Sequence, residues 1–566
     1  MSQSIFRRKS LEQIHKDAAS GMSDAHESNM KRVLGVRDLT FMGVAAIVGA
    51  GIFSTIGKAS FEGGPGIVML FIFVSVACGF AAMCYAEFAS MVPVSGSAYT
   101  YSYVAFGELI AWIIGWDLLM EYAIGNIAVA ISWSDYFTSL LDGFGMVMPR
   151  WMTMDYWTAQ DMGSDAATAA WLNAPEIGGV KLIFDLPAFF ITFIITWIIY
   201  VGIKESKRST NAMVIFKLAV IGLVILAGVF YVKPENWSPF MPNGLRGIMG
   251  GTAAVFFSYI GFDAISTTAE ECKDPQRDLP KSMFNALIIC TILYVVIALV
   301  LTGMVSYMDL NVGDPLAYVF QANDIDWLAG IIAISAIVAT ASVLMVFQLG
   351  QPRIWMSMSR DGLLPPAFSR IHPKYKTPSF STILTGLVVG IPAMFLNLDV
   401  VVDLCSVGTL FAFVLVCAGI IRLQQQRKKL AAEGRADEIP ESKYKIPYVN
   451  GRFIVPALFI VTVILFSTFN PGGVGALFEM TGDGWGGIRE QIPFIAFGVI
   501  FLVMAVLSFL RSYSLIPVLG FLCCAYLLCE SGTSNWERFL VWLVIGLVIY
   551  FLYGKHRSKL NEERQV

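Results

Sequence analysis

Apolar stretches of about 20 residues recur along almost the whole chain, which is the length that an α-helix needs to cross a bilayer. The repeat predicts fourteen membrane-spanning helices, near 39–60, 65–91, 99–141, 183–202, 210–231, 247–270, 281–305, 327–358, 379–397, 400–422, 453–470, 491–510, 513–531 and 535–553. The third and eighth stretches are longer than the hydrocarbon requires, so we expect them to tilt or project. The pattern predicts an all-α polytopic membrane protein.

Glycines interrupt two of these apolar stretches near their middle. The first reads Ile47-Val48-Gly49-Ala50-Gly51-Ile52-Phe53, and the second reads Phe257-Ser258-Tyr259-Ile260-Gly261-Phe262-Asp263. A helix in hydrocarbon must satisfy its own backbone, so an unwound turn persists there only inside protein or beside a watery cavity. Breaks at corresponding positions of two halves are typical of a transporter with a site at the bilayer midplane. The two breaks therefore predict a carrier.

Lys and Arg are distributed unevenly among the polar segments. If the N-terminus is placed inside, 31 of the 39 fall in inside segments, six in outside loops, and two, Lys58 and Lys217, within spans. Cytoplasmic loops carry an excess of Lys and Arg. We therefore predict a multi-pass protein of the cell membrane with both termini in the cytoplasm. The composition agrees, because only 14% of the residues are charged, against about 25% in soluble proteins.

The spans fall into three groups. Spans one to five (38–233) and six to ten (246–425) form two halves of similar length. An odd number of spans per half forces opposite orientations, which predicts an inverted repeat. The other segments are an N-terminal arm (1–37), a long outside loop (142–182), a cytoplasmic loop (426–452), four further spans (453–553) and a cytoplasmic tail (554–566). A loop as long as 142–182 is functional or disordered, and the sequence leaves this open.

The first break supplies backbone groups suited to an amino acid. Unwinding at Gly49, Ala50 and Gly51 would free N–H groups at the start of the outer half-helix, where the helix dipole favours a carboxylate. Carbonyls freed near Ile47 and Val48 could accept from an ammonium group. The alternative is a packing face of small residues, since glycine is common in membrane helices.

The second break offers further acceptors. Freed carbonyls between Phe257 and Ile260, including that of Ser258, could bind an α-amino group. The Phe257 ring could cover a bound substrate as a gate, or it could be ordinary core packing. Asp263 could cap the following half-helix or face the cavity, and both can hold together.

Three side chains within the spans are candidates for carrying a proton. Lys217 lies about 10 Å into the fifth span, where it could snorkel to the cytoplasmic interface. Alternatively, it is a buried amine that binds and releases a proton, and that bridges the first and eighth spans through freed carbonyls and hydroxyls. Glu121, with Asp117 in the third span, is another candidate relay, unless it is tightly paired with a neighbour.

No motif for a cofactor is present. The stretch Gly51-Ile52-Phe53-Ser54-Thr55-Ile56-Gly57-Lys58-Ala59 has five residues between its glycines and Ala after the lysine, whereas a phosphate-binding loop needs four residues and then Ser or Thr. The nine cysteines show no zinc spacing and no outside pair for a disulfide. No nucleophile–base or metal constellation suggests an enzyme. We expect no cofactor, no metal and no nucleic-acid partner.

The chain resembles the cationic amino acid transporter family of the amino acid–polyamine–organocation superfamily over about residues 32–425. Beside the two breaks, the resemblance is carried by Tyr85-Ala86-Glu87-Phe88-Ala89, Pro93-Val94-Ser95-Gly96-Ser97-Ala98-Tyr99 and Met358-Ser359-Arg360-Asp361-Gly362-Leu363-Leu364-Pro365. It implies a leucine-transporter-like fold with a 5+5 inverted repeat, four additional C-terminal helices and rocking-bundle alternating access. It also implies proton-coupled uptake, in which the amine of Lys217 replaces a sodium ion.

The same resemblance implies which residues contact the substrate. The backbone of the first span would bind the carboxylate, carbonyls of the sixth would bind the amine, Phe257 would be the gate, and Asp263 would shape selectivity. Thr340 and Ala341 of the eighth span would contact the substrate side chain, and Ser342 is a candidate hydroxyl partner of Lys217. This small, weakly polar set does not look dedicated to a guanidinium group, so neutral and cationic L-amino acids both stay open as substrates.

Two other functions remain as alternatives. One is an exchanger of polyamines or other organic cations, which would have no use for a carboxylate site. The other is a non-transporting amino acid sensor, although no signalling domain is visible. The sequence identifies no partner subunit.

Overall fold

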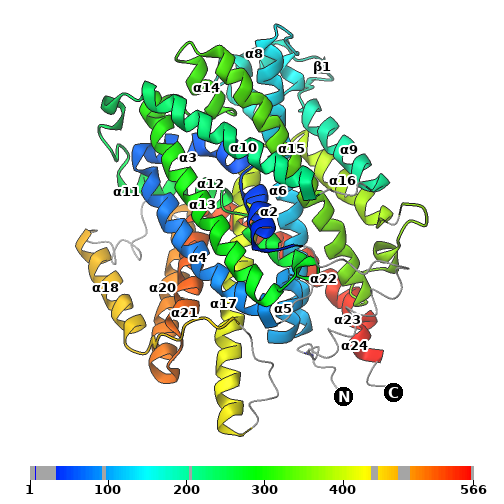
Figure 1. The fold of residues 1–566 in the computed structure, drawn as a ribbon, viewed down its shortest axis with the longest axis vertical. Helices are drawn as coiled ribbons and strands as arrows, with labels where there is room; N and C mark the ends of the chain where they lie inside the picture. The colour runs from blue at the N-terminus through cyan, green and yellow to red at the C-terminus, as the bar shows by residue number, and fades with distance from the viewer. Residues whose placement is uncertain are drawn as a thin grey trace.

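The computed structural model describes residue 7 and residues 34–91, 97–202, 207–375, 377–434, 444–469 and 485–562. Its helices form an elongated bundle, with the short elements α8 and β1 at one end and α23 and α24 at the other (Figure 1). Arg7 and Ser558 both donate to the carboxylate of Glu108. The first and last described segments therefore lie on one side of the bundle, as an even number of spans requires.

The first half contains the elements of the first five predicted spans. These are α2 (Val36–Ile47), the π-turn η1 (Gly51–Thr55), α3 (Ile56–Gly63), η2 (Gly64–Gly66), α4 (Ile67–Met91), α5 (Ser97–Ala105), α6 (Glu108–Gly143), α9 (Leu186–Val201), α10 (Lys207–Gly228) and η4 (Val229–Tyr231). The third predicted span, 99–141, is wrong as one helix, because α5 and α6 are separate. Gly107, with φ of 100°, turns the chain between them, a conformation that favours glycine.

The second half follows the same order. Its elements are η5 (Pro234–Trp237), α11 (Gly244–Gly250), α12 (Thr252–Phe257), η6 (Phe262–Glu271), α13 (Pro275–Met304), η7 (Tyr307–Asp309), α14 (Pro315–Gln321), α15 (Asp326–Arg360), η8 (Pro366–Ser369), α16 (Ser379–Ala393) and α17 (Leu398–Ala432). α17 continues well past 422, where the sequence predicts the tenth span to end. Its basic last turns extend the helix beyond the apolar stretch.

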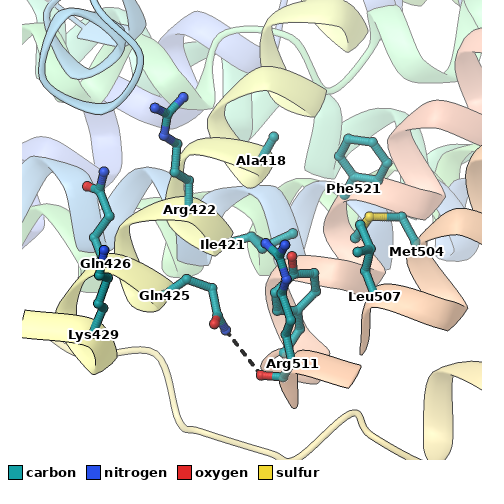
Figure 2. Close-up of a pocket in the computed structure, with 11 residues that line it drawn as sticks. Ala418, Ile421, Arg422, Gln425, Gln426, Lys429, Met504, Leu507, Arg511 and Phe521 are labelled. Carbon is teal, nitrogen blue, oxygen red and sulfur yellow. Dashed lines mark hydrogen bonds between the residues drawn. The ribbon is translucent and has the colours of Figure 1, made fainter. Parts of the chain in front are cut away.

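The C-terminal part contains four further spans and a short tail. Its elements are α18 (Ile454–Phe469), α20 (Trp485–Arg511), α21 (Leu515–Glu530), α22 (Thr533–Ile549), η10 (Tyr550–Gly554), α23 (Lys555–Arg557) and α24 (Lys559–Glu562). α21 packs against α17 and α4, whereas α18 and α20 lie at the edge of the bundle (Figure 1). A crevice opens between α17, α20 and α21 (Figure 2).

Every predicted span coincides with a helix or a broken helix. Within the described residues, eight helices are long and apolar enough to cross a membrane, a ninth is bent by 44° at Gly251, and four shorter apolar helices accompany them. One of the eight, Gly51–Met91, combines the outer part of the first span with the second. The prediction of an all-α polytopic membrane protein is confirmed.

Burial separates a central group of helices from a peripheral one. The apolar part of α6 is 89% buried, whereas that of α20 is 22% buried. α6 packs along α15 and α17, so that a long helix from each half meets at the centre of the bundle. The helices of the predicted 5+5 unit therefore surround the two breaks, and the last helices border the lipid.

The outside loop 142–182 is folded. It contains η3 (Arg150–Met152), α7 (Tyr156–Asp161), α8 (Asp165–Asn173) and the hairpin β1 (Glu176–Ile177) and β2 (Val180–Lys181). Ala159 and Ala170 form a small core with Ile183. Asn397 at the start of α17 donates to the hydroxyl of Thr158 at 2.8 Å. The loop is thus packed on the second half as an ordered cap.

Candidate functional site

The first span breaks where its sequence predicts. α2 ends at Ile47, and Val48 leaves the helix with φ of −79° and ψ of 91°. The chain resumes as the π-turn that begins at Gly51, and the N–H groups of Ile52 and Phe53 both point to the carbonyl of Gly49 at 3.1 and 3.2 Å. The end of α2 therefore exposes carbonyls that its own helix no longer satisfies.

Side chains from three neighbouring helices satisfy this break. Tyr294 on α13 donates to the carbonyl of Ile47 at 3.0 Å. Lys217 on α10 donates to the carbonyls of Ala45 and Val48, both at 3.0 Å. Tyr136 on α6 donates to the carbonyl of Phe53 on the outer side. The break is therefore held open by donors that come from outside its own helix.

Lys217 is fully enclosed. Its side chain is 1% exposed, and its third partner is the hydroxyl of Ser342 on α15 at 3.4 Å. Within the described part of the chain no carboxylate forms an ion pair with it. Snorkelling to the interface is thus wrong, because the ammonium bonds inside the bundle. The predicted contacts with freed carbonyls and a hydroxyl are confirmed, whereas the role in proton coupling stays a prediction.

The second break lies in the sixth span, between α12 and η6. The N–H groups of Ser258, Tyr259 and Ile260 are satisfied by carbonyls three or four residues earlier, at 2.9 to 3.3 Å. Gly261 has φ of 111°, and a Cβ there would lie 3.1 Å from the backbone of Ala46. Only glycine fits this conformation and this approach to α2. The second break is thus closed by its own tight turn.

The two breaks meet directly. A Cβ on Gly51 would lie 2.5 Å from the Cα of Ser258, so the two main chains are in contact. Thr55 donates to the carbonyl of Gly51 at 2.9 Å and is 3.2 Å from that of Ala254 in α12. The breaks face each other, as a shared site between them requires.

The other predicted substrate residues lie around this meeting point. Phe257 and Ile260 in the second break are 7% and 5% exposed, and Ala50 is likewise buried. The hydroxyl of Thr340 donates to the carbonyl of Ala336 on its own helix at 2.7 Å. Ala341 follows it on α15 and is partly buried. α15 thus presents alkyl groups and a satisfied hydroxyl, and contact with a substrate stays a prediction.

Three carboxyl groups are buried close to the breaks. Asp263 is 3% exposed, and its carboxyl lies within reach of the backbone N–H groups of its own turn, as a capping residue would. Glu121 is 2% exposed, near the hydroxyl of Thr409 and close enough to Asp263 for an electrostatic interaction. Asp117, one turn earlier, is fully buried, and both its oxygens lack a hydrogen-bond partner among the described residues. A relay role of Glu121 stays a prediction.

Sequence reasoning missed the tyrosines that hold the first break. Tyr294 and Tyr136 are both fully buried, and each donates to a backbone carbonyl of the first span. The hydroxyl of Ser54 in η1 also forms a hydrogen bond of 2.6 Å with that of Ser132 in α6. A tyrosine within an apolar span carries no signal of its partner, because its ring alone accounts for burial. Only the packing of α13 and α6 against α2 identifies these residues.

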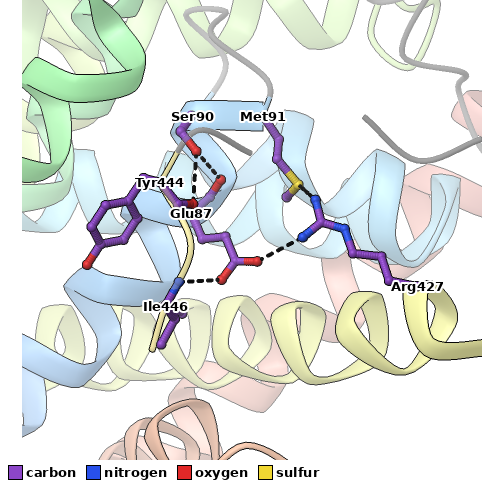
Figure 3. A network of polar contacts seen from close by, with 6 residues as sticks. All are labelled: Glu87, Ser90, Met91, Arg427, Tyr444 and Ile446. Atoms are coloured by element: carbon purple, nitrogen blue, oxygen red, sulfur yellow. Dashed lines mark hydrogen bonds and ion pairs between the residues drawn. The ribbon is translucent and has the colours of Figure 1, made fainter. Parts of the chain in front are cut away.

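One buried acidic residue of the first half belongs to a different network. Glu87 near the end of α4 accepts from Arg427 on α17 at 3.2 Å and from the backbone N–H of Ile446 at 3.3 Å (Figure 3). Arg427 also contacts the sulfur of Met91. This network joins α4, α17 and the chain that follows α17. It lies at the end of the bundle, away from the breaks.

Known proteins match almost all of the chain. Residues 34–480 match the amino acid permease family, and residues 513–558 match the C-terminus of that permease family. The chain is 38% identical to the branched-chain amino acid permease BcaP of Bacillus subtilis (strain 168), over 99% of this chain and 100% of that protein. It is 36% identical to the methylthioribose transporter of the same organism, with the same coverage. It is 30% identical to the vacuolar cationic amino acid transporter 2 of Arabidopsis thaliana, over 98% of this chain and 93% of that protein.

Proposed function

Since the chain belongs to the amino acid permease family and is a multi-pass membrane transporter rather than an enzyme, we propose that it couples amino acid uptake to protons. The observation that carries this proposal is the position of Lys217, whose ammonium bridges the first break and α15 without a carboxylate partner. A buried cation held only by neutral groups is a natural proton carrier, because water entry can remove its proton.

The substrate carboxylate would bind at the first break. The N–H groups of Ile52 and Phe53 are already bonded to Gly49, which leaves those of Ala50 and Gly51 as donors. These groups lie at the positive end of the outer half-helix, which favours an anion.

The substrate amine would bind at the second break. The carbonyls of Ile47 and Val48 already accept from Tyr294 and Lys217. The carbonyl of Phe257 likewise accepts from the N–H of Ile260. We therefore assign the amine to the carbonyls of Ser258, Tyr259 and Ile260, which lie against the first break.

We propose neutral amino acids with apolar side chains as the main substrates. The hydroxyl of Thr340 is satisfied within α15, so this helix offers alkyl groups of Thr340, Ala341 and Val343. The name of the branched-chain relative supports the same class. A second candidate is methylthioribose, since the relative named for that substrate is nearly as similar.

Proton binding and substrate binding would bias one inward–outward equilibrium. Protonated Lys217 ties α10 to the end of α2 and to α15. Loss of the proton leaves a neutral amine with one N–H donor fewer and without charge-assisted bonds. This loosens the three helices, so that the neutral state favours release to the cytoplasm. A ligand shifts such an equilibrium only through different affinities for the two states.

Uptake into proteoliposomes tests the coupling. Wild-type protein should accumulate labelled leucine when the outside is acidic, and Lys217→Gln should lose pH-driven accumulation while it keeps counterflow of labelled substrate. Lys58→Gln is the matched control, because Lys58 pairs with the exposed Asp399 at 3.0 Å and lies away from the break. Full pH-driven accumulation by Lys217→Gln would refute the proposal.

The same vesicles separate the alternative functions. A panel of leucine, arginine, spermidine and methylthioribose as competitors should show that leucine competes best. Equal competition by spermidine would favour the organic-cation exchanger, since spermidine has no carboxylate for the first break. An amino acid sensor would bind leucine but show no counterflow.

We also propose the cell membrane as the location, with both termini in the cytoplasm. The distribution of Lys and Arg supports this orientation, and the first and last described segments lie on one side of the bundle. Some relatives are named for vacuoles, so fractionation of cells that express a C-terminal reporter is the test. A reporter that is active only outside the cytoplasm would contradict it.

A further inference from the structure

A crevice of about 460 Å³ opens between α17, α20 and α21, and none of the residues that line it belongs to the two breaks. α17 forms one wall, and α20 with the start of α21 forms the other (Figure 2). The crevice thus lies at the seam between the second repeat and the C-terminal helices.

The wall formed by α17 changes from apolar to basic along its length. Ala418 and Ile421 line the inner part, whereas Arg422 and Lys429 line the outer part. Arg422 lies four residues after Ala418 and Lys429 lies seven residues after Arg422, while Ile421 lies three residues after Ala418. These side chains therefore share one side of the helix. From Ala418 to Lys429 the helix rises about 16 Å. That rise spans the passage from hydrocarbon to headgroup region.

The opposite wall repeats this change. Met504 and Leu507 on α20 and Phe521 on α21 face Ile421, and Arg511 ends α20 at the level of the basic residues (Figure 2). On α20, Leu510 is 70% exposed, as expected for a helix that borders lipid. The crevice itself is open to the surface beside this helix.

The charges in the crevice are of one sign. Among the described residues that line it, Arg422, Lys429 and Arg511 are basic and none is acidic. Lys429 has only a loose, exposed ion pair with Glu433 at 3.9 Å, and Arg422 lies over the ring of Phe106. Exposed pairs of this kind are weak. The three cations therefore keep donors for an anion.

The mouth of the crevice is also built rather than accidental. Lys428 and Tyr448 both donate to the carbonyl of Ser512, at 3.0 and 2.9 Å. Gln425 donates to the carbonyl of Arg511 at 3.4 Å (Figure 2). These bonds hold the end of α20 against α17, so the backbone that carries Arg511 is positioned beside the basic face of α17.

We propose that the crevice binds an anionic phospholipid from the adjacent leaflet. Its phosphodiester lies between Arg422, Lys429 and Arg511, and an acyl chain follows the apolar walls inward. Basic pockets between membrane helices on the cytoplasmic side are suited to anionic headgroups. Guanidinium groups match phosphate oxygens in pairs, which favours Arg at two of the three positions. The bound lipid joins the C-terminal helices to the second repeat.

Thermal unfolding of the purified full-length protein tests this site. In a neutral detergent, added phosphatidylglycerol should raise the apparent Tm of the wild type, and phosphatidylcholine should not, since a ligand that binds the native state stabilises it. The variant Arg422→Gln/Lys429→Gln/Arg511→Gln should bind phosphatidylglycerol on the order of 100-fold more weakly, because each basic residue near the headgroup contributes about fivefold. Lipid that co-purifies with each protein, measured by mass spectrometry, gives an independent readout.

The matched control is Lys273→Gln/Arg277→Gln/Lys281→Gln, which removes three basic residues from an exposed patch near the start of α13. In this control, phosphatidylglycerol should raise the apparent Tm as much as in the wild type. The proposal is overturned if phosphatidylglycerol raises the Tm of the crevice variant and of the wild type equally. It is also overturned if phosphatidylcholine raises the Tm of the wild type as much as phosphatidylglycerol does. If glycerol phosphate stabilises the wild type as strongly as phosphatidylglycerol, the ligand is a soluble anion and the lipid assignment is wrong. Transport plays no part in these readouts, so the result is independent of the proposed function.

Discussion

The two breaks occupy corresponding places in the two halves, yet their backbone groups are satisfied in different ways. The first break depends on side chains from other helices, namely Lys217, Tyr294 and Tyr136. The second is closed by hydrogen bonds within its own tight turn, which Gly261 makes possible. One break therefore depends on the packing and protonation of its neighbours, and the other does not.

This difference assigns separate tasks to the two halves. A backbone held by an ammonium group responds to the loss of one proton, because the amine then has one N–H donor fewer and no charge to strengthen its remaining bonds. The bonds between main-chain groups in the second turn do not depend on that proton. We infer that the first break is the element that moves with protonation, and that the second supplies a fixed surface against which it moves.

The largest effect is expected where the two breaks touch. Gly51→Ala places a Cβ 2.5 Å from the Cα of Ser258, so the two main chains must separate. Overpacking of this kind costs about 1–3 kcal/mol of stability, and it also displaces the proposed carboxylate site. We expect loss of transport and a lower Tm. Gly222→Ala is the control, since a Cβ there meets nothing within 4 Å; equal uptake by both variants would show that the contact is not needed.

The second largest effect should come from the turn of the second break. Gly261→Ala forces a φ of 111° on a residue with a Cβ, at a cost of about 1–2 kcal/mol, and it also crowds Ala46. Uptake and Tm should both fall. The residual uptake should keep the pH profile of the wild type, because Lys217, the proposed proton carrier, does not bond to this turn. A changed profile would contradict the separation of tasks.

The sequence predicts the fold well because membrane helices can be recognised from local sequence. Their length is set by the bilayer and their orientation by Lys and Arg, and the glycines at 49, 51 and 261 indicate where they unwind. The limits appear where structure depends on contacts between distant spans. The separation of α5 from α6 depends on Gly107, which looks like any other glycine within an apolar stretch.

The candidate site shows the same limit. Lys217 could be found from sequence because a cation within a span is unusual, but spacing alone favoured the membrane interface rather than the interior. Its two carbonyl partners, Ala45 and Val48, lie 172 and 169 residues earlier in the chain. The crevice between α17 and α20 has no local motif at all, since its basic residues read as ordinary cytoplasmic charges.

A smaller effect is expected at Tyr294. Tyr294→Phe leaves the carbonyl of Ile47 without this donor, and a buried unsatisfied group costs about 1–3 kcal/mol. The Tm should fall and uptake should slow, while pH-driven accumulation persists because Lys217 is unchanged. Tyr259→Phe is the matched control, since Tyr259 donates at the same distance of 3.0 Å to the carbonyl of Phe71 in the continuous helix α4. If the Tm falls equally in both variants, the hydroxyl of Tyr294 contributes no more to stability than a hydrogen bond to a continuous helix does.

The smallest effect should come from Ser342. Its hydroxyl is the most distant partner of Lys217, at 3.4 Å, and it also donates to the carbonyl of Ala339 at 2.6 Å. Ser342→Ala should lower stability by about 1 kcal/mol, the usual contribution of one hydrogen bond. The pH midpoint of leucine uptake should move slightly toward acid, because the protonated amine loses one acceptor while the neutral amine loses little. Ser335→Ala on the same helix is the control, since Ser335 is buried without contact to Lys217. A midpoint that stays at the wild-type value in Ser342→Ala would mean that the two carbonyls of the first break alone hold the charged amine.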